Sequence, residues 1–182
     1  MELSNQQTLP VAQALAWEAL NDIAMLQAAI PGCESIVATA PDHYDVAITA
    51  AIGPVKAKFK GKLRLADITP PDSYTLHFEG QGGAAGHGKG HATVRLEAVG
   101  PHETRLHYTA HATVGGKIAQ VGSRLVDMAA AKMAGEFFSQ FTEALVAKHP
   151  PPEAAEAAAP EAPPATSLLG RIAAWWRGLF GG

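Results

Sequence analysis

Histidines are the side chains of this sequence best suited to chemistry, and the chain contains eight of them. Two pairs, His87 with His91 and His107 with His111, are four residues apart in segments with strand-like alternation. Four residues of strand span about 13 Å, which is too far for two imidazoles to share a metal ion. Only His91 and His111 could meet, across neighbouring strands on the expected solvent face, and no cysteine or carboxylate cluster joins them. We therefore predict no metal site.

Cys33 is the only cysteine, which excludes an internal disulfide framework and a cysteine-based zinc site. We interpret it as a small, buried, apolar residue rather than a nucleophile. The sequence shows no nucleophile elbow, no pattern of serine, histidine and aspartate, and no paired carboxylates. We therefore predict no catalytic residues and expect a protein that is not an enzyme.

The glycine-rich stretch GQGGAAGHGKG, residues 80–90, resembles a phosphate-binding loop only superficially. A dinucleotide fingerprint needs a strand before it and a helix directly after it, whereas strand-like segments flank this stretch on both sides. Glycines in strands let the chain bend sharply and let another group approach the backbone closely. We expect that structural role here, with a helix or a ligand as the approaching group.

Positive charge is concentrated in one segment of a chain whose formal net charge is −3. Residues 55–65 alternate, with apolar side chains on one face and Lys56, Lys58, Lys60, Lys62 and Arg64 on the other. This stripe is typical of a solvated sheet face, although it would also attract lipid head groups or an acidic partner. The chain lacks the basic excess of nucleic-acid-binding proteins, so we expect no nucleic-acid partner.

Hydrophobic periodicity predicts the elements that position these residues. We expect a strand over residues 2–9, a helix opened by Pro10, and a second short helix over residues 23–29. From residue 34 to residue 114 the period is two, which predicts six or seven antiparallel strands in chain order. If the last two form a hairpin, Glu97 faces Arg105 and Val94 faces Tyr108. One long helix, residues 116–148, then closes the domain.

Small residues dominate the middle of that helix, and this predicts a cavity. Residues 129–135 read AAAKMAG, and the strand positions expected to face them are also small: Ala92, Ala110 and Ala112. Because protein interiors are normally close-packed, we infer a dry, apolar cavity between helix and sheet. The alternative is that Phe59, Phe78 and Tyr108 fill this space.

The last 34 residues differ from the domain of residues 1–148. Residues 149–166 are rich in proline, alanine and glutamate, which predicts a disordered linker. Residues 167–182 have helical amphipathic spacing but are too short to span a bilayer, so we predict a helix that lies in the membrane interface. A partner groove or the protein's own body are the alternative docking sites. The predicted membrane-binding residues are Leu168, Leu169, Arg171, Ile172, Trp175, Trp176, Arg177, Leu179 and Phe180.

Five motifs in the same order resemble the CoxG family of carbon monoxide dehydrogenase proteins over roughly residues 1–147. They are AWEALND, IPGCES, GQGGAAGHGKGHATVRL, TRLHYTAHATVGGKIAQVGSRLVD and FFSQF. The resemblance implies an α+β, START-like (SRPBCC) helix-grip fold, in which a curved antiparallel sheet wraps a long C-terminal helix. It also implies association with molybdenum hydroxylase-type dehydrogenases, such as carbon monoxide dehydrogenase, and transport of a quinone between the membrane and the enzyme.

We therefore expect a carrier of menaquinone or ubiquinone, cytoplasmic and attached to the inner face of the cell membrane. Tyr108 is the expected hydrogen-bond donor to the quinone ring. A membrane recruitment or assembly factor without a ligand is the alternative, and a cyclase or hydrolase of the same fold is a third. The predicted ligand-binding residues are Phe59, Phe78, Val94, Tyr108, Leu125, Ala129, Met133 and Phe137.

Overall fold

The computed structural model describes residues 1–152, and a compact body extends from Met1 to Pro151. The predicted linker beyond residue 152 and the predicted tail helix lie outside the described residues. No helix within residues 1–152 has both the length and the apolar character needed to cross a membrane.

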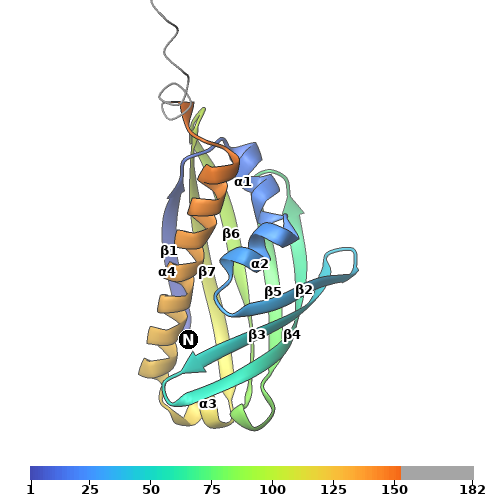
Figure 1. Ribbon diagram of the computed structural model, residues 1–182, viewed down its shortest axis with the longest axis vertical. Coiled ribbons are helices and arrows are strands. Elements are labelled where there is room, and N and C mark those ends of the chain that lie inside the picture. Colours follow the sequence, from blue (N-terminus) through green and yellow to red (C-terminus); the bar gives the residue numbers. More distant parts are fainter. Residues whose placement is uncertain (153–182) are drawn as a thin grey trace, which may run out of the picture. The chain divides into compact units, whose positions relative to one another are not determined.

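Seven antiparallel strands form a single sheet, as the period-two pattern predicted. They are β1 (Glu2–Leu9), β2 (Cys33–Ala40), β3 (His43–Ile52), β4 (Val55–Thr69), β5 (Ser73–Gln81), β6 (His87–Gly100) and β7 (Glu103–Gly115). Their spatial order is β1-β7-β6-β5-β4-β3-β2, so β2 to β7 follow chain order and β1 joins the edge beside β7. The strands β2 to β4 curve toward the helices (Figure 1).

The predicted hairpin register is confirmed. Glu97 pairs with Arg105 and Val94 with Tyr108 across β6 and β7. Along β4, the side chains of the lysine stripe are exposed and the alternate side chains turn inward. The outer sheet face is therefore polar, and the inner face lies against the helices.

Four helices and one short turn complete the body. They are α1 (Gln13–Leu20), α2 (Ile23–Ala29), α3 (Lys117–Gln120), α4 (Ser123–Lys148) and the 3-10 turn η1 (Gly83–Ala85). Figure 1 shows α4 running along the sheet beside α1 and α2. The second short helix lies at residues 23–29 as predicted, whereas the other two predicted helices differ from the structure. Helix α1 begins at Gln13, three residues after Pro10, and the expected single closing helix is interrupted at Gly122, whose φ of 97° suits glycine.

Asp22 joins the start of α2 to the end of α4. Its Oδ1 accepts hydrogen bonds from the backbone N–H groups of Ala24 and Met25, at 3.0 and 3.2 Å. Its Oδ2 accepts from Lys148 Nζ at 3.0 Å. The hydrogen bond from Lys148, followed by that from the Met25 N–H, lowers the pKa of Asp22 below its ordinary value. The carboxylate thus caps one helix and anchors another.

The core is concentrated at one end of the body. Phe138, Phe141 and Leu145, from the second half of α4, are buried against α1, α2 and the sheet. Thr104, fully buried on β7, donates its hydroxyl to the carbonyl of Val11 at 2.8 Å and so ties the sheet to the chain before α1. The first half of α4 contributes only one buried residue, Val126. The large buried side chains are therefore concentrated beside the second half of α4.

Candidate functional site

Two adjoining apolar cavities lie between the sheet and the helices. Cavity A, about 280 Å³, lies beside α2 and the second half of α4, and cavity B, about 390 Å³, lies beside α3 and the first half of α4. Ile30, Leu63 and Leu76 line both cavities. The predicted cavity is therefore present, in two parts. Phe59, Phe78 and Tyr108 form parts of its walls and do not fill it.

Cavity B exists because the residues that face it on α4 are small. Ala129 and Ala130 line it, together with the flexible side chain of Met133 one turn further along. Ala112 of β7 forms part of the opposite wall. Ala92 lines cavity A, whereas Ala110 lines neither cavity. The small-residue segment of the helix therefore marks the larger of the two spaces, as predicted.

Glycines of the glycine-rich stretch make room for two aromatic walls of cavity B. A Cβ atom on Gly82 would lie 2.4 Å from Cε1 of Phe59. A Cβ atom on Gly90 would lie 2.0 Å from the carbonyl oxygen of His111 and 2.9 Å from Cζ of Phe78. The groups that approach these glycines are therefore phenylalanine rings and a neighbouring strand. No helix follows the stretch, since β6 begins directly after η1.

Tyrosines give cavity A a polar character that cavity B lacks. Tyr44, Tyr74 and Tyr108 all line it. Burial raises the pKa of both Tyr74 and Tyr108, so their hydroxyl groups stay protonated and able to donate hydrogen bonds. The ring of Tyr108 stacks on Phe138 with centroids 5.1 Å apart, which orients it from the helix side. The walls of cavity A therefore combine apolar side chains with tyrosines that can donate hydrogen bonds.

Seven of the eight residues predicted to contact a ligand lie in these walls. Val94, Tyr108 and Phe137 line cavity A, and Phe59, Phe78, Ala129 and Met133 line cavity B. Contact of these residues with a ligand stays a prediction.

Leu125 is wrongly placed in that set, because it lies outside both cavities and is 41% exposed. Val126, only 5% exposed, lines cavity B instead. The break at Gly122 sets where the face of α4 points, and neighbouring helix positions differ in direction by about 100°.

Several lining residues were not predicted from the sequence. Leu63, Tyr74 and Leu76 belong to the inward face of the strands, and their alternation was a signal that could have identified them. Ile30, which lies directly after α2, had no comparable signal because it enters the wall only through the position of that helix.

The histidine and cysteine candidates stand apart from the cavities. The rings of His91 and His111 face each other across β6 and β7 with centroids 5.2 Å apart. Within residues 1–152, no group of three or more histidine, cysteine, aspartate or glutamate side chains could hold a metal ion. Cys33 is only partly buried, and this burial raises the pKa of its thiol, which disfavours the nucleophilic thiolate.

Solved structures share this architecture. A conserved protein from Geobacillus kaustophilus is 28% identical, with a TM-score of 0.77, over 81% of this chain and 97% of its own. The Zhui aromatase/cyclase from Streptomyces sp. R1128 is 11% identical, with a TM-score of 0.59, over 80% and 93% of the two chains. Ara h 8.0201 is 14% identical, with a TM-score of 0.56, over 81% and 98%. The last two show the shared fold alone, a helix-grip sheet packed on a long C-terminal helix.

No curated protein matches the sequence. The family of the CoxG subunit of carbon monoxide dehydrogenase matches residues 7–146, which include every strand from β2 to β7 and nearly all of α4. This match spans most of the chain. The chain belongs to the CoxG family of carbon monoxide dehydrogenase proteins.

Proposed function

We propose that this protein carries a lipophilic small molecule, a respiratory quinone, between the membrane and a molybdenum hydroxylase-type dehydrogenase such as carbon monoxide dehydrogenase. The observation that carries the proposal is the pair of adjoining apolar cavities, about 280 and 390 Å³, inside the body. Pockets for small molecules typically have volumes of about 300–1,000 Å³ and mostly apolar walls with a few polar groups. Membership of the CoxG family supports the choice of dehydrogenase.

The division into two cavities suits an amphiphile with a compact ring and an apolar chain. In cavity A, the hydroxyl of Tyr108 would donate to a ring carbonyl while the ring packs among Val94 and Phe137. In cavity B, Phe59, Ala129 and Met133 would contact the isoprenoid chain. Burial of apolar surface stabilises such a complex by about 25 cal/mol per Å².

A carrier needs no reacting group, which agrees with the lack of a recognisable catalytic motif in the sequence. We accordingly propose that the protein is not an enzyme. Attachment to the inner face of the cell membrane would be supplied by the amphipathic segment of residues 167–182, whose role stays a prediction from the sequence. A flexible linker of about 18 residues has a root-mean-square length of roughly 24 Å, which would let the body move between membrane and enzyme.

Extraction of the bound molecule tests the carrier proposal. The full chain would be produced in a quinone-containing host, purified without detergent, and examined by native mass spectrometry and by organic extraction. We expect a quinone at up to one molecule per chain, and a lower occupancy for Tyr108→Phe. A body that is empty as purified, and that takes up neither menaquinone nor ubiquinone analogues, would contradict the proposal.

A recruitment factor without cargo is the second candidate, and it is favoured by the charged outer sheet face. Ala112→Phe projects a ring into cavity B, and Ala51→Phe adds the same ring at an exposed position on β3. In an assay of electron flow from dehydrogenase to membrane quinone, carriage predicts that Ala112→Phe stops flow while membrane and enzyme binding persist. Recruitment predicts that both variants support flow as well as the wild type.

A further inference from the structure

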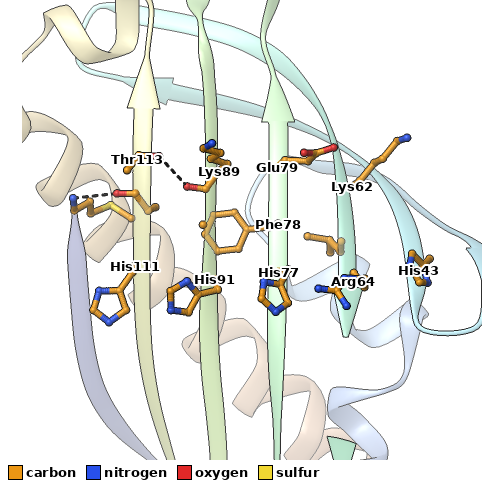
Figure 2. Close-up of a pocket in the computed structure, with 14 residues that line it drawn as sticks. His43, Lys62, Arg64, His77, Phe78, Glu79, Lys89, His91, His111 and Thr113 are labelled. Carbon is orange, nitrogen blue, oxygen red and sulfur yellow. Dashed lines mark hydrogen bonds between the residues drawn. The ribbon is translucent and has the colours of Figure 1, made fainter. Parts of the chain in front are cut away.

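Five neighbouring strands place a basic side chain at the same level of the outer sheet face. Each member lies opposite the next in the strand register, from β3 to β7. Figure 2 shows them in a line on one side of the sheet. We call them the imidazole row: His43, Arg64, His77, His91 and His111.

The imidazole row has only one carboxylate partner among residues 1–152. Ring centroids of His77 and His91 are 6.1 Å apart, and those of His91 and His111 are 5.2 Å apart. Glu2 on β1, whose Oε2 lies 3.7 Å from Nδ1 of His111, is the only carboxylate that pairs with the row among residues 1–152. Like charges directly opposite each other destabilise a sheet. A bound anion from outside the protein would therefore stabilise the protonated row by reducing this repulsion.

The next level of the same face is arranged differently. There, Lys89 lies opposite Glu79, Glu79 opposite Lys62, and Lys62 opposite Asp45, so positive and negative side chains alternate across the strands. We call this set the alternating row. The charges of the alternating row therefore compensate one another, whereas those of a protonated imidazole row do not.

A furrow of about 790 Å³ runs across the strands between the two rows. In Figure 2 the imidazole row forms one wall, and Thr113, Lys89, Glu79 and Lys62 form the other. Five strands about 4.8 Å apart give the furrow a length of roughly 19 Å, which matches about six residues of extended peptide. The ionisable groups that face or flank it are the amine of Met1 and Glu2 on β1, His111 on β7, His91 and Lys89 on β6, His77 and Glu79 on β5, Arg64 and Lys62 on β4, and His43 and Asp45 on β3.

We propose that this furrow is a docking site for an extended, carboxylate-rich segment of a partner protein, bound more tightly as the imidazoles gain protons. The guanidinium of Arg64, in the middle of the row, supplies a pH-independent anchor that can hold a carboxylate with two hydrogen bonds. The other members of the row are imidazoles, which carry a positive charge only when protonated, so we expect binding to depend on pH. The site lies outside the cavities and does not depend on the identity of any cargo.

The shape and composition of the furrow favour a peptide over a bilayer. A peptide can enter a recessed furrow, whereas a bilayer surface would contact only the tips of the flanking side chains. Surfaces that bind the membrane interface generally insert apolar side chains. Among the residues that line the furrow, Met1 is the only large apolar one with high exposure, at 37%.

Fluorescence anisotropy with a labelled hexaglutamate peptide and the full chain tests the proposal, with hexaglutamine as the neutral probe. Exposed charge pairs each contribute about 0.2–1 kcal/mol, so we expect affinity roughly tenfold higher at about pH 6 than at about pH 8. The double variant His77→Gln with His91→Gln should lose most of that difference. Arg64→Gln should weaken binding about threefold at both pH values. His102→Gln, in the exposed β6–β7 turn, is the matched control and should bind as the wild type does.

Circular dichroism and thermal melts would show whether each variant keeps its fold. If the double histidine variant does not fold, the peptide affinity of Arg64→Gln still tests the proposal. Wild-type protein that binds hexaglutamate no better than hexaglutamine, or equally at both pH values, would overturn the proposal. Vesicles containing phosphatidylglycerol provide the second arm of the experiment. If the double variant loses vesicle binding while peptide binding is unchanged, the face contacts lipid and the peptide proposal is wrong.

Discussion

Replacement of Ala129 by Phe should stabilise the empty body and at the same time remove its capacity for cargo. Ala129 lines cavity B, whose volume of about 390 Å³ can accept a phenyl ring without moving the walls. Burial of a Phe side chain contributes about 1.5–3 kcal/mol, and the lower helix propensity of Phe costs roughly 0.5 kcal/mol. The free energy of unfolding should thus rise by about 1–2.5 kcal/mol. For a body of this size, each kcal/mol raises Tm by about 2–4 °C.

Ala131→Phe is the control, because Ala131 is exposed on the same helix and the added ring would stay in water. It should lower the free energy of unfolding slightly through helix propensity alone. Urea denaturation of the ligand-free proteins would measure both changes, and uptake of a menaquinone analogue would be measured in parallel. Destabilisation of Ala129→Phe by more than about 1 kcal/mol would indicate overpacking and would contradict the presence of an open cavity. If Ala129→Phe is stabilised and still takes up the menaquinone analogue as well as the wild type does, cavity B is not the site that binds the isoprenoid chain.

Three further predictions concern the ring site, the helix junction and the tail. Tyr108→Phe should weaken quinone binding by about 2–10-fold, the contribution of one neutral hydrogen bond, while Tm changes little; equal affinity in a binding titration would remove Tyr108 from its proposed role. Asp22→Ala should lower the free energy of unfolding by about 1 kcal/mol through the lost helix cap, and more weakly through the solvent-screened pair with Lys148. The pKa of Asp22 is lower in the folded state than its unfolded value of about 3.9. The contribution of Asp22 to the free energy of unfolding is therefore fully present above the unfolded-state pKa and is lost as the pH falls through the folded-state pKa. The Tm of the variant should accordingly change less than that of the wild type between neutral and acidic pH. Deletion of residues 167–182 should abolish co-sedimentation with vesicles and leave the melting of the body unchanged; unaltered co-sedimentation would place the membrane contact elsewhere.

Local sequence patterns were sufficient to predict the sheet, because each strand's alternation depends only on which side chains face water. The β6–β7 register follows from the short turn between the strands, which makes Glu97 meet Arg105. The cavity was also predictable, since the alanines of residues 129–135 cannot fill the space beside a curved sheet. These features depend on neighbours in the sequence or on side-chain volume alone.

Tertiary structure decided the features that depend on how helices and strands are oriented relative to one another. Gly122 interrupts the closing helix, and the resulting orientation of α4 puts Val126 in the wall of cavity B and leaves Leu125 outside both cavities and 41% exposed. The position of α2 brings Ile30 between the two cavities, although nothing near Ile30 in the sequence requires it. The imidazole row needs the registers of four strand pairs at once, so its two ends, His43 and His111, join one line only when the whole sheet is formed. Secondary structure follows from local interactions, whereas the convergence of side chains on one site follows from long-range packing, which no local pattern encodes.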